Sequence, residues 1–561
     1  MRYIKEILKK NSIWVLVYIG LGIFNSFVAN YKVDYFQKVI DGLADRTLAF
    51  AGVATYGFIL LVNYCMNYLD NYPEKKLEHG IYLDFKLLSL RKISTIDYTE
   101  YQKIGTGKLV QRIENGSAAG RNVLFNFWLC LIRDLLPTIS FSIYFIWKID
   151  EKVTYVLFVG YTIIFVTTNI LLKFLYKIKE KILNSEELLN HYLVRGYMEM
   201  LVFRMSKQFP SEIKKTCNAK EDIVSSKVKM NMIHEAFFTI FALLVAVLDI
   251  GILFYAWKTK KLTVGSVVAL IALIENAYTP IAIFNVLYVQ YKLDKASYKR
   301  FEEFLGLKDD DQLRNGNAIN ADVGEIAIKN LSFQYGERKI IDDLSLSIKK
   351  GEKIAFVGES GSGKSTLIKI LLGLLKYNQG KVRLGDMELS GICLNNLYDR
   401  VSYLSQDAPV FDGTIKENLV FEKKVSEEQM LGALSEVQLS HLVENLAEGL
   451  NTEIGEKGTC LSGGEKQRLA LARLWFEDSE LVILDEATSA MDNLTEENVM
   501  KSVMQKKKDK TVIAIAHRLN SIAGFDRIIL FKEGRIVGQG TFEELLHTDS
   551  YFMDLYNANV K

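Results

Sequence analysis

The stretch Gly358-Glu-Ser-Gly-Ser-Gly-Lys-Ser-Thr366 decides the fold of the C-terminal half of the chain. It follows an apolar run at 354–357 and precedes another at 367–372, so the order predicts a strand, a tight loop and a helix. That is the setting of a phosphate-binding loop (P-loop), in which glycines let backbone N–H groups surround an anion at a helix N-terminus. We predict that Lys364 reaches the β- and γ-phosphates of a nucleotide and that the hydroxyl of Ser365 binds Mg²⁺. The nucleotide-binding residues predicted here are Gly358, Glu359, Ser360, Gly361, Ser362, Gly363, Lys364, Ser365 and Thr366.

An acidic pair, Asp485 and Glu486, ends the apolar run at 481–484. In a P-loop ATPase, an aspartate at such a strand end holds Mg²⁺. A second carboxylate directly after it can act as the general base that polarises the attacking water. The alternative is a strand that ends in a solvated acidic turn. Beside a P-loop, the pair predicts Asp485 as a metal residue and Glu486 as the catalytic base.

A second anion site is predicted at Leu461, Ser462, Gly463, Gly464 and Glu465, which precede a helical pattern at 466–473. Two glycines before a helix leave its first N–H groups accessible to an anion. One nucleotide needs only one P-loop. The second site therefore suggests that ATP is shared between two nucleotide-binding domains.

Length and composition limit the possible folds and partners of the chain. With 561 residues, the chain is too long to fold around a single hydrophobic core, and its length suggests three or four domain-sized units. A net charge of +2 gives no reason to expect nucleic acid as a partner. Five cysteines without paired spacing argue against a disulfide framework or a zinc site.

Long apolar stretches crowd into roughly the first 290 residues of the chain. A membrane-spanning helix needs about 20 mostly apolar residues, and few helices of a soluble bundle stay apolar on all faces for so long. Six stretches meet this requirement: 13–30, 50–69, 130–148, 152–173, 237–257 and 263–288. The first half of the chain is therefore predicted to be a membrane domain with six spanning helices.

The linkers after the second and fourth apolar stretches are long and basic. The N-terminus before the first stretch is also basic. The positive-inside rule then places the N-terminus and both long linkers in the cytoplasm. Apolar residues recur with helical spacing through 77–96 and 183–203, which predicts that the helices continue beyond the membrane. Residues 114–120 and 200–209 are the candidate turning points.

Two acidic residues lie inside predicted spans, Asp249 and Glu275. Ionisable side chains in a membrane are costly and mark functional sites. One interpretation places both on a cavity wall in contact with substrate. The other has them pairing within the bundle or lying in water near an extracellular opening.

With these motifs in order, the chain resembles the ATP-binding cassette (ABC) transporters of the exporter type, in particular bacterial multidrug, lipid or peptide exporters. The stretch 461–465 matches the signature motif of that family. Tyr335 matches the aromatic residue that stacks on adenine, and Gln406 matches the Q-loop glutamine. Residues 489–492, which end in Asp492, match the D-loop, and His517 matches the switch histidine that contacts the γ-phosphate. Glu465 stands where the family more often has glutamine, and Met491 where it has leucine.

The resemblance implies a half-transporter, in which a membrane domain precedes a nucleotide-binding domain. We expect an α-helical membrane domain at 1–305, a linker at 306–324 and an α/β P-loop ATPase domain of ABC type at 325–561. The implied cofactors are ATP and Mg²⁺, with Ser365, Gln406 and Asp485 around the metal. Glu486 and His517 are the implied catalytic residues.

The implied function is ATP-driven export of an amphipathic small molecule, lipid or peptide through alternating access. The partner would be a second copy of the chain or a paralogous half-transporter, in the cytoplasmic (inner) membrane, with the N-terminus and the nucleotide-binding domain in the cytoplasm. Three alternatives stay open: an importer built on the exporter fold, as in metal-chelate uptake, the competent half of a heterodimer, and an ABC ATPase without a transport role. The residues do not identify the cargo.

Overall fold

The computed structural model describes residues 2–198, 200–319, 322–455, 458, 460–516 and 518–560. Contacts divide the chain into two compact units. The first unit contains residues 1–94 and 104–307, and the second contains residues 95–103 and 308–561. We call them the helical unit and the nucleotide unit, and describe each by itself.

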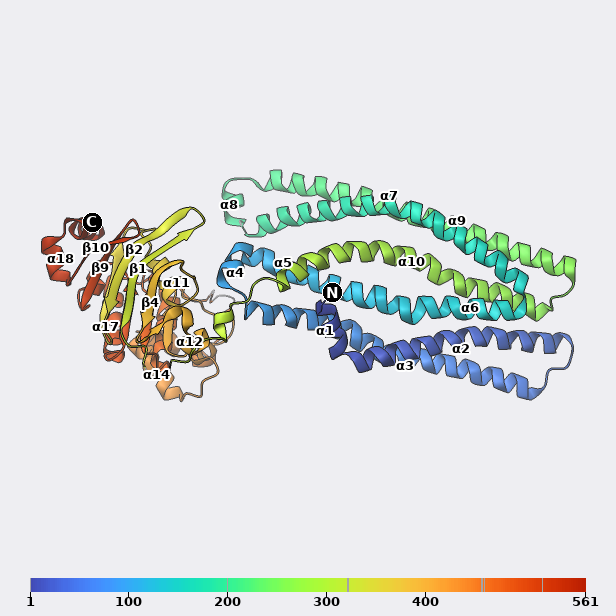
Figure 1. Ribbon diagram of the computed structural model, residues 1–561, viewed down its shortest axis with the longest axis horizontal. Coiled ribbons are helices and arrows are strands. Elements are labelled where there is room, and N and C mark those ends of the chain that lie inside the picture. The colour runs from blue at the N-terminus through green and yellow to red at the C-terminus, as the bar shows by residue number, and fades with distance from the viewer. Residues whose placement is uncertain are drawn as a thin grey trace. The chain divides into compact units, whose positions relative to one another are not determined.

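The helical unit consists of long helices (Figure 1). They are α1 (Arg2–Lys10), α2 (Ser12–Ala44), α3 (Phe50–Ile93), α5 (Thr106–Arg121), two π-helical segments η1 (Asn122–Leu129) and η2 (Leu131–Leu135), α6 (Leu136–Ile149), α7 (Glu151–Met198), α8 (Met200–Met205), α9 (Phe209–Thr259) and α10 (Val264–Leu305). The 51 residues of α9 extend about 77 Å at 1.5 Å per residue, more than twice the roughly 30 Å of a bilayer core. The stretches at 77–96 and 183–203 are helical as far as Ile93 and Met198, because α3 and α7 run on without a break from the predicted spans.

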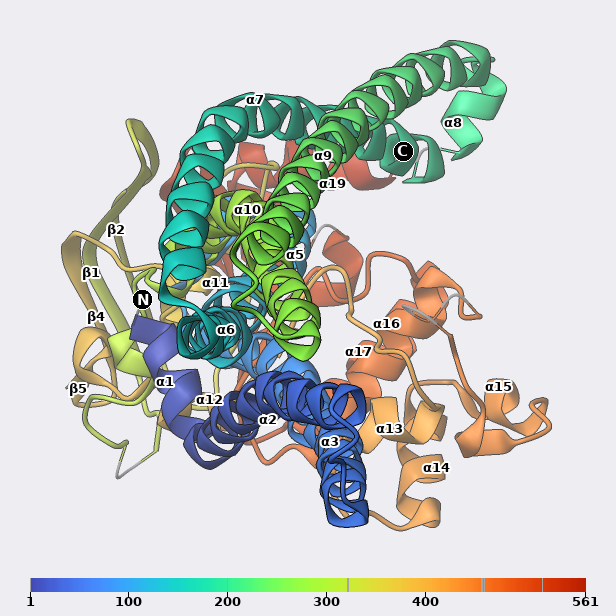
Figure 2. The same ribbon diagram turned by 90° about the vertical axis from the view of Figure 1, so that its right-hand side faces the viewer.

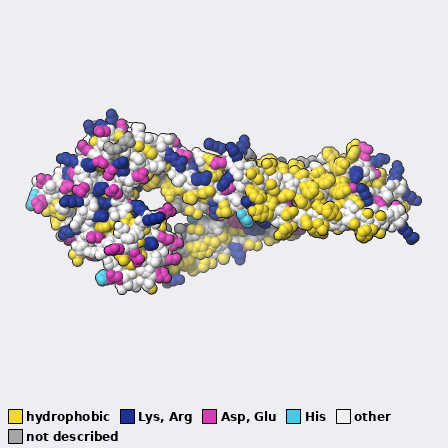
Figure 3. Space-filling model, turned by 90° about the horizontal axis from the view of Figure 1, so that it is seen from below, with side chains coloured by type: hydrophobic (Ala, Val, Ile, Leu, Met, Phe, Trp, Pro, Cys, Tyr) yellow, Lys and Arg dark blue, Asp and Glu magenta, His cyan; other side chains and the backbone are white. Residues whose placement is uncertain are grey.

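Five helices in the described part of the chain are long and apolar enough to cross a membrane. They lie in Ser12–Ala44, Phe50–Ile93, Lys108–Ile149, Phe209–Thr259 and Val264–Leu305. The remaining predicted span, 152–173, falls in α7, where most side chains between 161 and 174 lie outside the described part. Figure 3 shows hydrophobic side chains gathered over the outer surface of the helical unit, as expected of a multi-pass membrane domain.

The two candidate turning points have different outcomes. Residues 200–209 do turn the chain: α8 and the residues after it join α7 to α9, which run side by side in Figure 1 and are seen after a quarter turn in Figure 2. Residues 114–120 do not, because they lie inside α5. Their small residues serve packing instead, since a Cβ at Gly116 would collide with Phe301 and a Cβ at Gly120 with the ring of Phe85. The turn lies earlier, around Ser94–Asp97.

Polar pairs join α2 to α6 along one seam, which is buried at Asn30 and Ser142 and open to the outside at Lys148. Ser142 donates to Asn30 at 2.8 Å, and both side chains are fully buried. One turn further along, Lys148 donates to both oxygens of Asp34 at 2.8 and 3.0 Å. Hydrogen bonds between polar side chains hold helices together where lipid removes the hydrophobic driving force. The seam therefore sets the register of α2 against α6.

A buried ion pair joins η2 to α3, where the guanidinium of Arg133 contacts the carboxylate of Asp70. Arg133 also lies over the ring of Tyr18 at 4.1 Å and donates to its hydroxyl at 3.2 Å. The side chain reaches these partners by passing over Gly22 on α2, where a Cβ would collide with Cγ of Arg133. Gly22 therefore provides the space that the ion pair needs.

We expect Gly22→Ala to destabilise the membrane domain by about 1–3 kcal/mol, the usual effect of overpacking a buried site. Gly20→Ala is the matched control, because it lies on the same helix with nothing within 4 Å of its added Cβ. The control is expected to be neutral or slightly stabilising, since alanine favours helix over glycine. Thermal unfolding in detergent, followed by fluorescence, measures both variants. Equal melting temperatures for the two variants would contradict the packing role of Gly22.

The nucleotide unit contains two sheets and the helices around them. The strands are β1 (Ile326–Tyr335), β2 (Arg338–Ile348), β3 (Lys353–Gly358), β4 (Gln379–Leu384), β5 (Met387–Glu388), β6 (Val401–Leu404), β7 (Leu481–Asp485), β8 (Thr511–Ile515), β9 (Arg527–Lys532) and β10 (Arg535–Gly540). The helices are α4 (Tyr98–Ile104), most of which belongs to this unit, and α11 (Lys364–Leu371), α12 (Leu394–Tyr398), α13 (Ile415–Val420), α14 (Glu427–Glu436), α15 (Ser440–Glu444), α16 (Gly463–Ala472), α17 (Asn493–Lys506), α18 (Phe542–Thr548) and α19 (Ser550–Val560).

One sheet has the strand order β2-β1-β4-β5 and is antiparallel. The other has the order β10-β9-β3-β8-β7-β6, with all neighbours parallel except β10 and β9. Every residue of β7 and β8 is buried, as expected for central parallel strands. Parallel strands end at one edge of the sheet, where open α/β folds bind ligands. The P-loop after β3, the acidic pair at the end of β7 and Gln406 after β6 thus meet at that edge.

The short segment 95–103 belongs to the nucleotide unit, although it connects α3 to α5 of the helical unit. Asp97 N–H donates to the carbonyl of Lys308, and Tyr98 packs against the core below the P-loop strand. The stretch predicted as a linker also packs on this unit: Gln312 donates to the carbonyls of Leu389 and Ile392, and Ile319 is buried. Both chain segments that connect the units are therefore ordered against the nucleotide unit.

Candidate nucleotide site

The P-loop wraps around the amino group of its own lysine. Lys364 is 5% exposed, and its Nζ donates to the carbonyls of Gly358 and Glu359 at 2.6 and 2.9 Å. Burial lowers the pKa of Lys364, and the carboxylates of Glu486 and Asp485 oppose the shift. The ammonium therefore lies at the centre of the loop, close enough to Glu486 and Asp485 for their charges to affect its pKa.

Glycine is required at two positions of this loop. Gly358 has φ +152°, and a Cβ there would collide with the carbonyl oxygen of Phe531. Gly363 has φ +104°, in the left-handed region that residues with a side chain rarely adopt. It comes directly before α11, so its conformation brings the loop onto the helix N-terminus. Glu359, Ser360 and Gly361 are exposed at the tip, while Ser365 and Thr366 are half-buried in the first turn of α11.

The carboxylate of Asp485 is held by two hydroxyl groups. Ser365 Oγ donates to Oδ1 at 3.2 Å, and Tyr403 Oη donates to Oδ2 at 3.3 Å. Asp485 is 6% exposed, and burial raises its pKa while the hydroxyl of Ser365 opposes the shift. Burial also raises the pKa of Tyr403, so its hydroxyl remains a proton donor at neutral pH. Ser365 and Asp485 thus lie together as the sequence predicted, and Tyr403 is a neighbour that it did not predict.

Glu486 lies beside this cluster in a strained backbone conformation. Its φ is +53°, which is unusual for a residue other than glycine and is found most often at functional sites. Gln406 Nε2 donates to Oε2 of Glu486 at 2.7 Å. The two residues come from the ends of β7 and β6, so neighbouring strands bring the predicted general base and the predicted Q-loop glutamine into contact.

Tyr335 is the last residue of β1, and its ring is 43% exposed. It packs edge-on against Phe333, with 4.9 Å between the ring centroids. An exposed aromatic ring that is braced from one side leaves its other face accessible. That arrangement is suitable for stacking on a nucleotide base.

The stretch 461–465 forms the N-terminus of α16. Ser462 is the N-cap: Glu465 N–H donates to Ser462 Oγ at 3.4 Å. In return, the backbone N–H and the hydroxyl of Ser462 both donate to Oε2 of Glu465 at 2.7 Å. Burial raises the pKa of Glu465, but these hydrogen bonds outweigh it and the net pKa is lowered. Glu465, the departure from the family motif, thus closes a capping box.

Leu461 anchors this motif in the core, whereas Ser462 and Gly463 are exposed. Within the described residues, no hydrogen bond joins 461–465 to the P-loop. The predicted second anion site is therefore not hydrogen-bonded to the P-loop of its own chain within the described residues.

The structure assigns a role to Gln467 that sequence reasoning missed. Gln467 is 4% exposed on α16, donates to Ser489 Oγ at 3.0 Å and accepts from Ala490 N–H at 2.8 Å. Arg518 holds the same loop from the other side through the carbonyls of Met491 and Ser489. In the sequence, the only indication of this role was that Gln467 lies five residues after Ser462. Hydrogen bonds thus connect α16, the helix that begins with the signature motif, to the D-loop at 489–492.

The remaining predicted residues are not part of this cluster. Asp492 is exposed and caps α17 by accepting from Thr495 N–H at 3.0 Å. His517 lies outside the described residues. In the helical unit, Asp249 lies on α9 and Glu275 on α10. One oxygen of Asp249 is buried without a hydrogen-bond partner among the described residues, and Glu275 is exposed.

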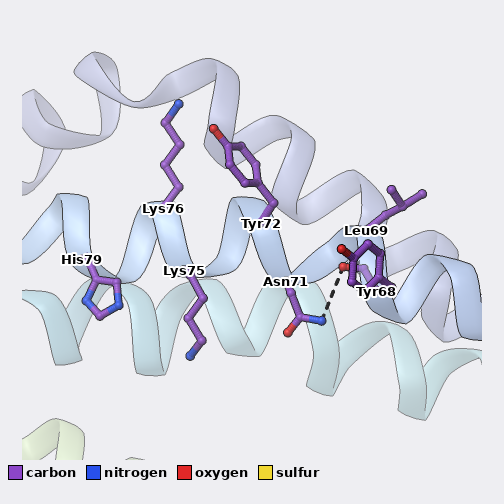
Figure 4. Close-up of a pocket in the computed structure, with 7 residues that line it drawn as sticks. All are labelled: Tyr68, Leu69, Asn71, Tyr72, Lys75, Lys76 and His79. Carbon is purple, nitrogen blue, oxygen red and sulfur yellow. Dashed lines mark hydrogen bonds between the residues drawn. The ribbon is translucent and has the colours of Figure 1, made fainter.

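A groove of about 740 Å³ lies on α3 (Figure 4). The residues that line it are Tyr68, Leu69, Asn71, Tyr72, Lys75, Lys76 and His79. Tyr72 packs edge-on against Trp14, and the ammonium of Lys76 lies 3.8 Å from the centroid of the Trp14 ring. Aromatic and basic side chains together are typical of the level where a helix leaves the bilayer. The groove shares no residue with the nucleotide site.

Residues 341–489, which include the P-loop, Gln406, the 461–465 motif and the acidic pair, match the family described as ABC transporter. This part of the chain belongs to the ABC transporter family. Over 240 residues the chain is 38% identical to the ATP-dependent lipid A-core flippase of Francisella tularensis, a match that covers 42% of the chain and 39% of the flippase. It is 25% identical over 535 residues to the ABC transporter ATP-binding protein exp8 of Streptococcus pneumoniae, covering 94% and 91% of the two chains.

The fold of the chain is similar to that of a solved structure, a bacterial Atm1-family ABC exporter with ATP bound. The TM-score is 0.83 at 20% sequence identity, over 99% of both chains. These findings confirm the predicted family, the fusion of a membrane domain to an ABC ATPase domain, and the predicted fold class. The match to the flippase spans about two fifths of that relative's length.

Proposed function

We propose that the chain is an ATP-driven exporter that works as a dimer through alternating access. The observation that carries the proposal is the cluster of Lys364, Ser365, Asp485, Glu486 and Gln406 at one sheet edge. It lies in the same polypeptide as five helices, counted over the described residues, that are long and apolar enough to cross a membrane. The residue cluster is what ATP hydrolysis needs, and the apolar helices are what transport across a membrane needs.

Each residue of the cluster has a role in this proposal. Lys364 binds the β- and γ-phosphates, and Glu486 is the general base for the attacking water. Ser365, Asp485 and Gln406 offer hydroxyl, carboxylate and amide oxygens, the ligand types that Mg²⁺ prefers. When bound, Mg²⁺ neutralises charge on the phosphates. His517 is proposed to contact the γ-phosphate, and Tyr335 to stack on adenine.

The nucleotide is proposed to be bound between two chains. The P-loop of one chain would hold the phosphates, and the signature stretch 461–465 of the other, with Asp492 near it, would cover them. The exposed N-terminus of α16, which no hydrogen bond joins to its own P-loop within the described residues, supports this arrangement. The partner is a second copy of the chain or a paralogous half-transporter.

Exposed apolar residues beyond the predicted spans also support a dimer. On α3, Leu83 and Leu90 are 59% and 64% exposed, well past the end of the span at 69. On α8, Leu201 and Met205 are 68% and 77% exposed. Apolar side chains that are exposed outside the bilayer can be covered by a protein partner. With the N-terminus and long helix extensions in the cytoplasm, the second copy would cover these side chains.

The tip that carries α8 is braced for a mechanical role. Arg195 at the end of α7 forms an ion pair with Glu212 at the start of α9, and Glu212 is 5% exposed. The ion pair links the end of α7 to the start of α9 on either side of α8. ATP binding and release would act on the membrane helices through this end of the hairpin.

The proposed cargo is an amphipathic small molecule, lipid or peptide, and Asp249 with Glu275 is the proposed contact with it. In lipid nanodiscs, we expect an amphipathic cargo to stimulate ATP hydrolysis severalfold. Asp249→Asn and Glu275→Gln, each made as a single variant, should reduce that stimulation but not the basal hydrolysis. Glu151→Gln, an exposed residue at the start of α7, is the control. Unchanged stimulation in both variants would remove the pair from the cargo site.

Transport direction is tested with labelled cargo in everted membrane vesicles. ATP outside such vesicles is expected to drive cargo inward, because the cytoplasmic face is exposed. ATP-driven loss of cargo from the vesicles would contradict export and indicate uptake into the cell.

A further inference from the structure

The tyrosine at the end of β6 has a contact that the proposed mechanism does not use. Tyr403 lies on the strand beside β7, with Cα opposite Ile483. Its hydroxyl donates to Oδ2 of Asp485 at 3.3 Å, while Oδ1 accepts from Ser365 at 3.2 Å. Such hydroxyl–carboxylate contacts are long, and contacts of this kind commonly shorten when substrate is bound.

The two hydroxyls contact different oxygens of one buried carboxylate. The terminal torsion of an aspartate is broad, so packing alone does not fix the plane of its carboxylate. Ser365 fixes one oxygen only, and Ser365 is itself a proposed metal ligand. Tyr403 is the second anchor, and it holds the oxygen on the side away from Ser365.

The ring of Tyr403 is itself held by packing. It is half-buried and packs against the core cluster that contains β3. Tyr98 of α4 packs on the same core. Tyr98 in turn accepts a hydrogen bond from Gln102 at 3.0 Å. The phenol thus reaches Asp485 from a well-packed position.

We propose that Tyr403 is a positioning residue for the nucleotide-bound metal ion, because it holds Oδ2 of Asp485 and so keeps Oδ1 directed at Ser365. The inference rests on the proposed function, in which Asp485 and Ser365 hold Mg²⁺. Groups that orient metal ligands through hydrogen bonds tune the affinity for the metal without touching it. Tyr403 would act in this way and would not contact the nucleotide.

The test compares Tyr403→Phe with its parent, both in a Glu486→Gln background so that nucleotide is not consumed. Binding of a fluorescent ATP analogue is measured with saturating Mg²⁺ and with EDTA, and the ratio of the two affinities gives the contribution of the metal. We expect Tyr403→Phe to bind the analogue normally in EDTA and to lose about tenfold of the gain from Mg²⁺, the usual effect of removing such a partner.

Tyr398→Phe is the matched control. Tyr398 is half-buried, packs on the same core, and lies within electrostatic range of Asp310. It should keep the full gain from Mg²⁺. A gain in Tyr403→Phe equal to that of the parent overturns the inference, and so does an equal loss of binding with and without Mg²⁺, which would indicate a purely structural role. A parent that binds no nucleotide, or gains nothing from Mg²⁺, would overturn the proposed function itself.

Discussion

Glu486→Gln is expected to abolish ATP turnover while the protein still binds ATP. The carboxylate lies next to Asp485 and accepts a hydrogen bond from Gln406 at 2.7 Å, in a backbone conformation that only a constrained site retains. An amide of the same size keeps the packing but cannot take a proton from water. Loss of a general base typically lowers a rate by about 10²- to 10⁴-fold.

Phosphate release and binding of labelled ATP are measured on the same purified protein. Glu497→Gln is the control, because Glu497 is an exposed residue of α17 that pairs only loosely with Lys501, at 3.7 Å. The control should hydrolyse ATP at the parental rate. Hydrolysis by Glu486→Gln at that same rate would show that another group activates the water.

A complementation experiment tests whether ATP is bound between two chains. One chain carries Lys364→Ala in the P-loop, and the other carries Ser462→Arg at the N-terminus of α16. Both also carry Glu486→Gln, so that bound ATP is retained. Dimers of either variant alone contain no intact site and should bind at least about a hundredfold less ATP, because each lacks a main contact to the phosphates.

Mixed dimers, isolated through two different tags, should regain one site. In them, the intact P-loop of the Ser462→Arg chain faces the intact signature of the Lys364→Ala chain. ATP retained after desalting is the readout, and dimers that carry only Glu486→Gln give the full value. Mixed dimers as empty as the single variants would mean that each chain binds nucleotide by itself.

In the nucleotide unit, most of the architecture could be predicted from local sequence. The P-loop is a strand, a loop and a helix within about twenty residues, and its glycines are needed for backbone reasons that neighbouring residues already define. Asp485 and Glu486 follow an apolar strand directly. Parallel strands end at one edge, so strand ends that carry chemistry are expected to meet there.

In the helical unit, the membrane spans could also be predicted from local sequence, but one turn was predicted wrongly. Apolar length is a property of the chain itself, so spans could be recognised before any packing was known. The small residues at 114–120 were interpreted as a turn, but Gly116 and Gly120 lie inside α5 against Phe301 and Phe85. Glycine permits a turn and a close helix contact equally, and only the neighbouring helix decides between them.

By itself, the sequence determined that this chain has long apolar helices, one P-loop and one signature helix, because each of these depends on residues close together in the chain. The tertiary structure alone decided which distant residues touch. It placed Tyr403 on Asp485, Gln467 on the D-loop, and Arg133 over Gly22 against Asp70. Those contacts depend on strand order and helix packing, which bring together residues separated by tens to more than a hundred positions, and no local pattern records them.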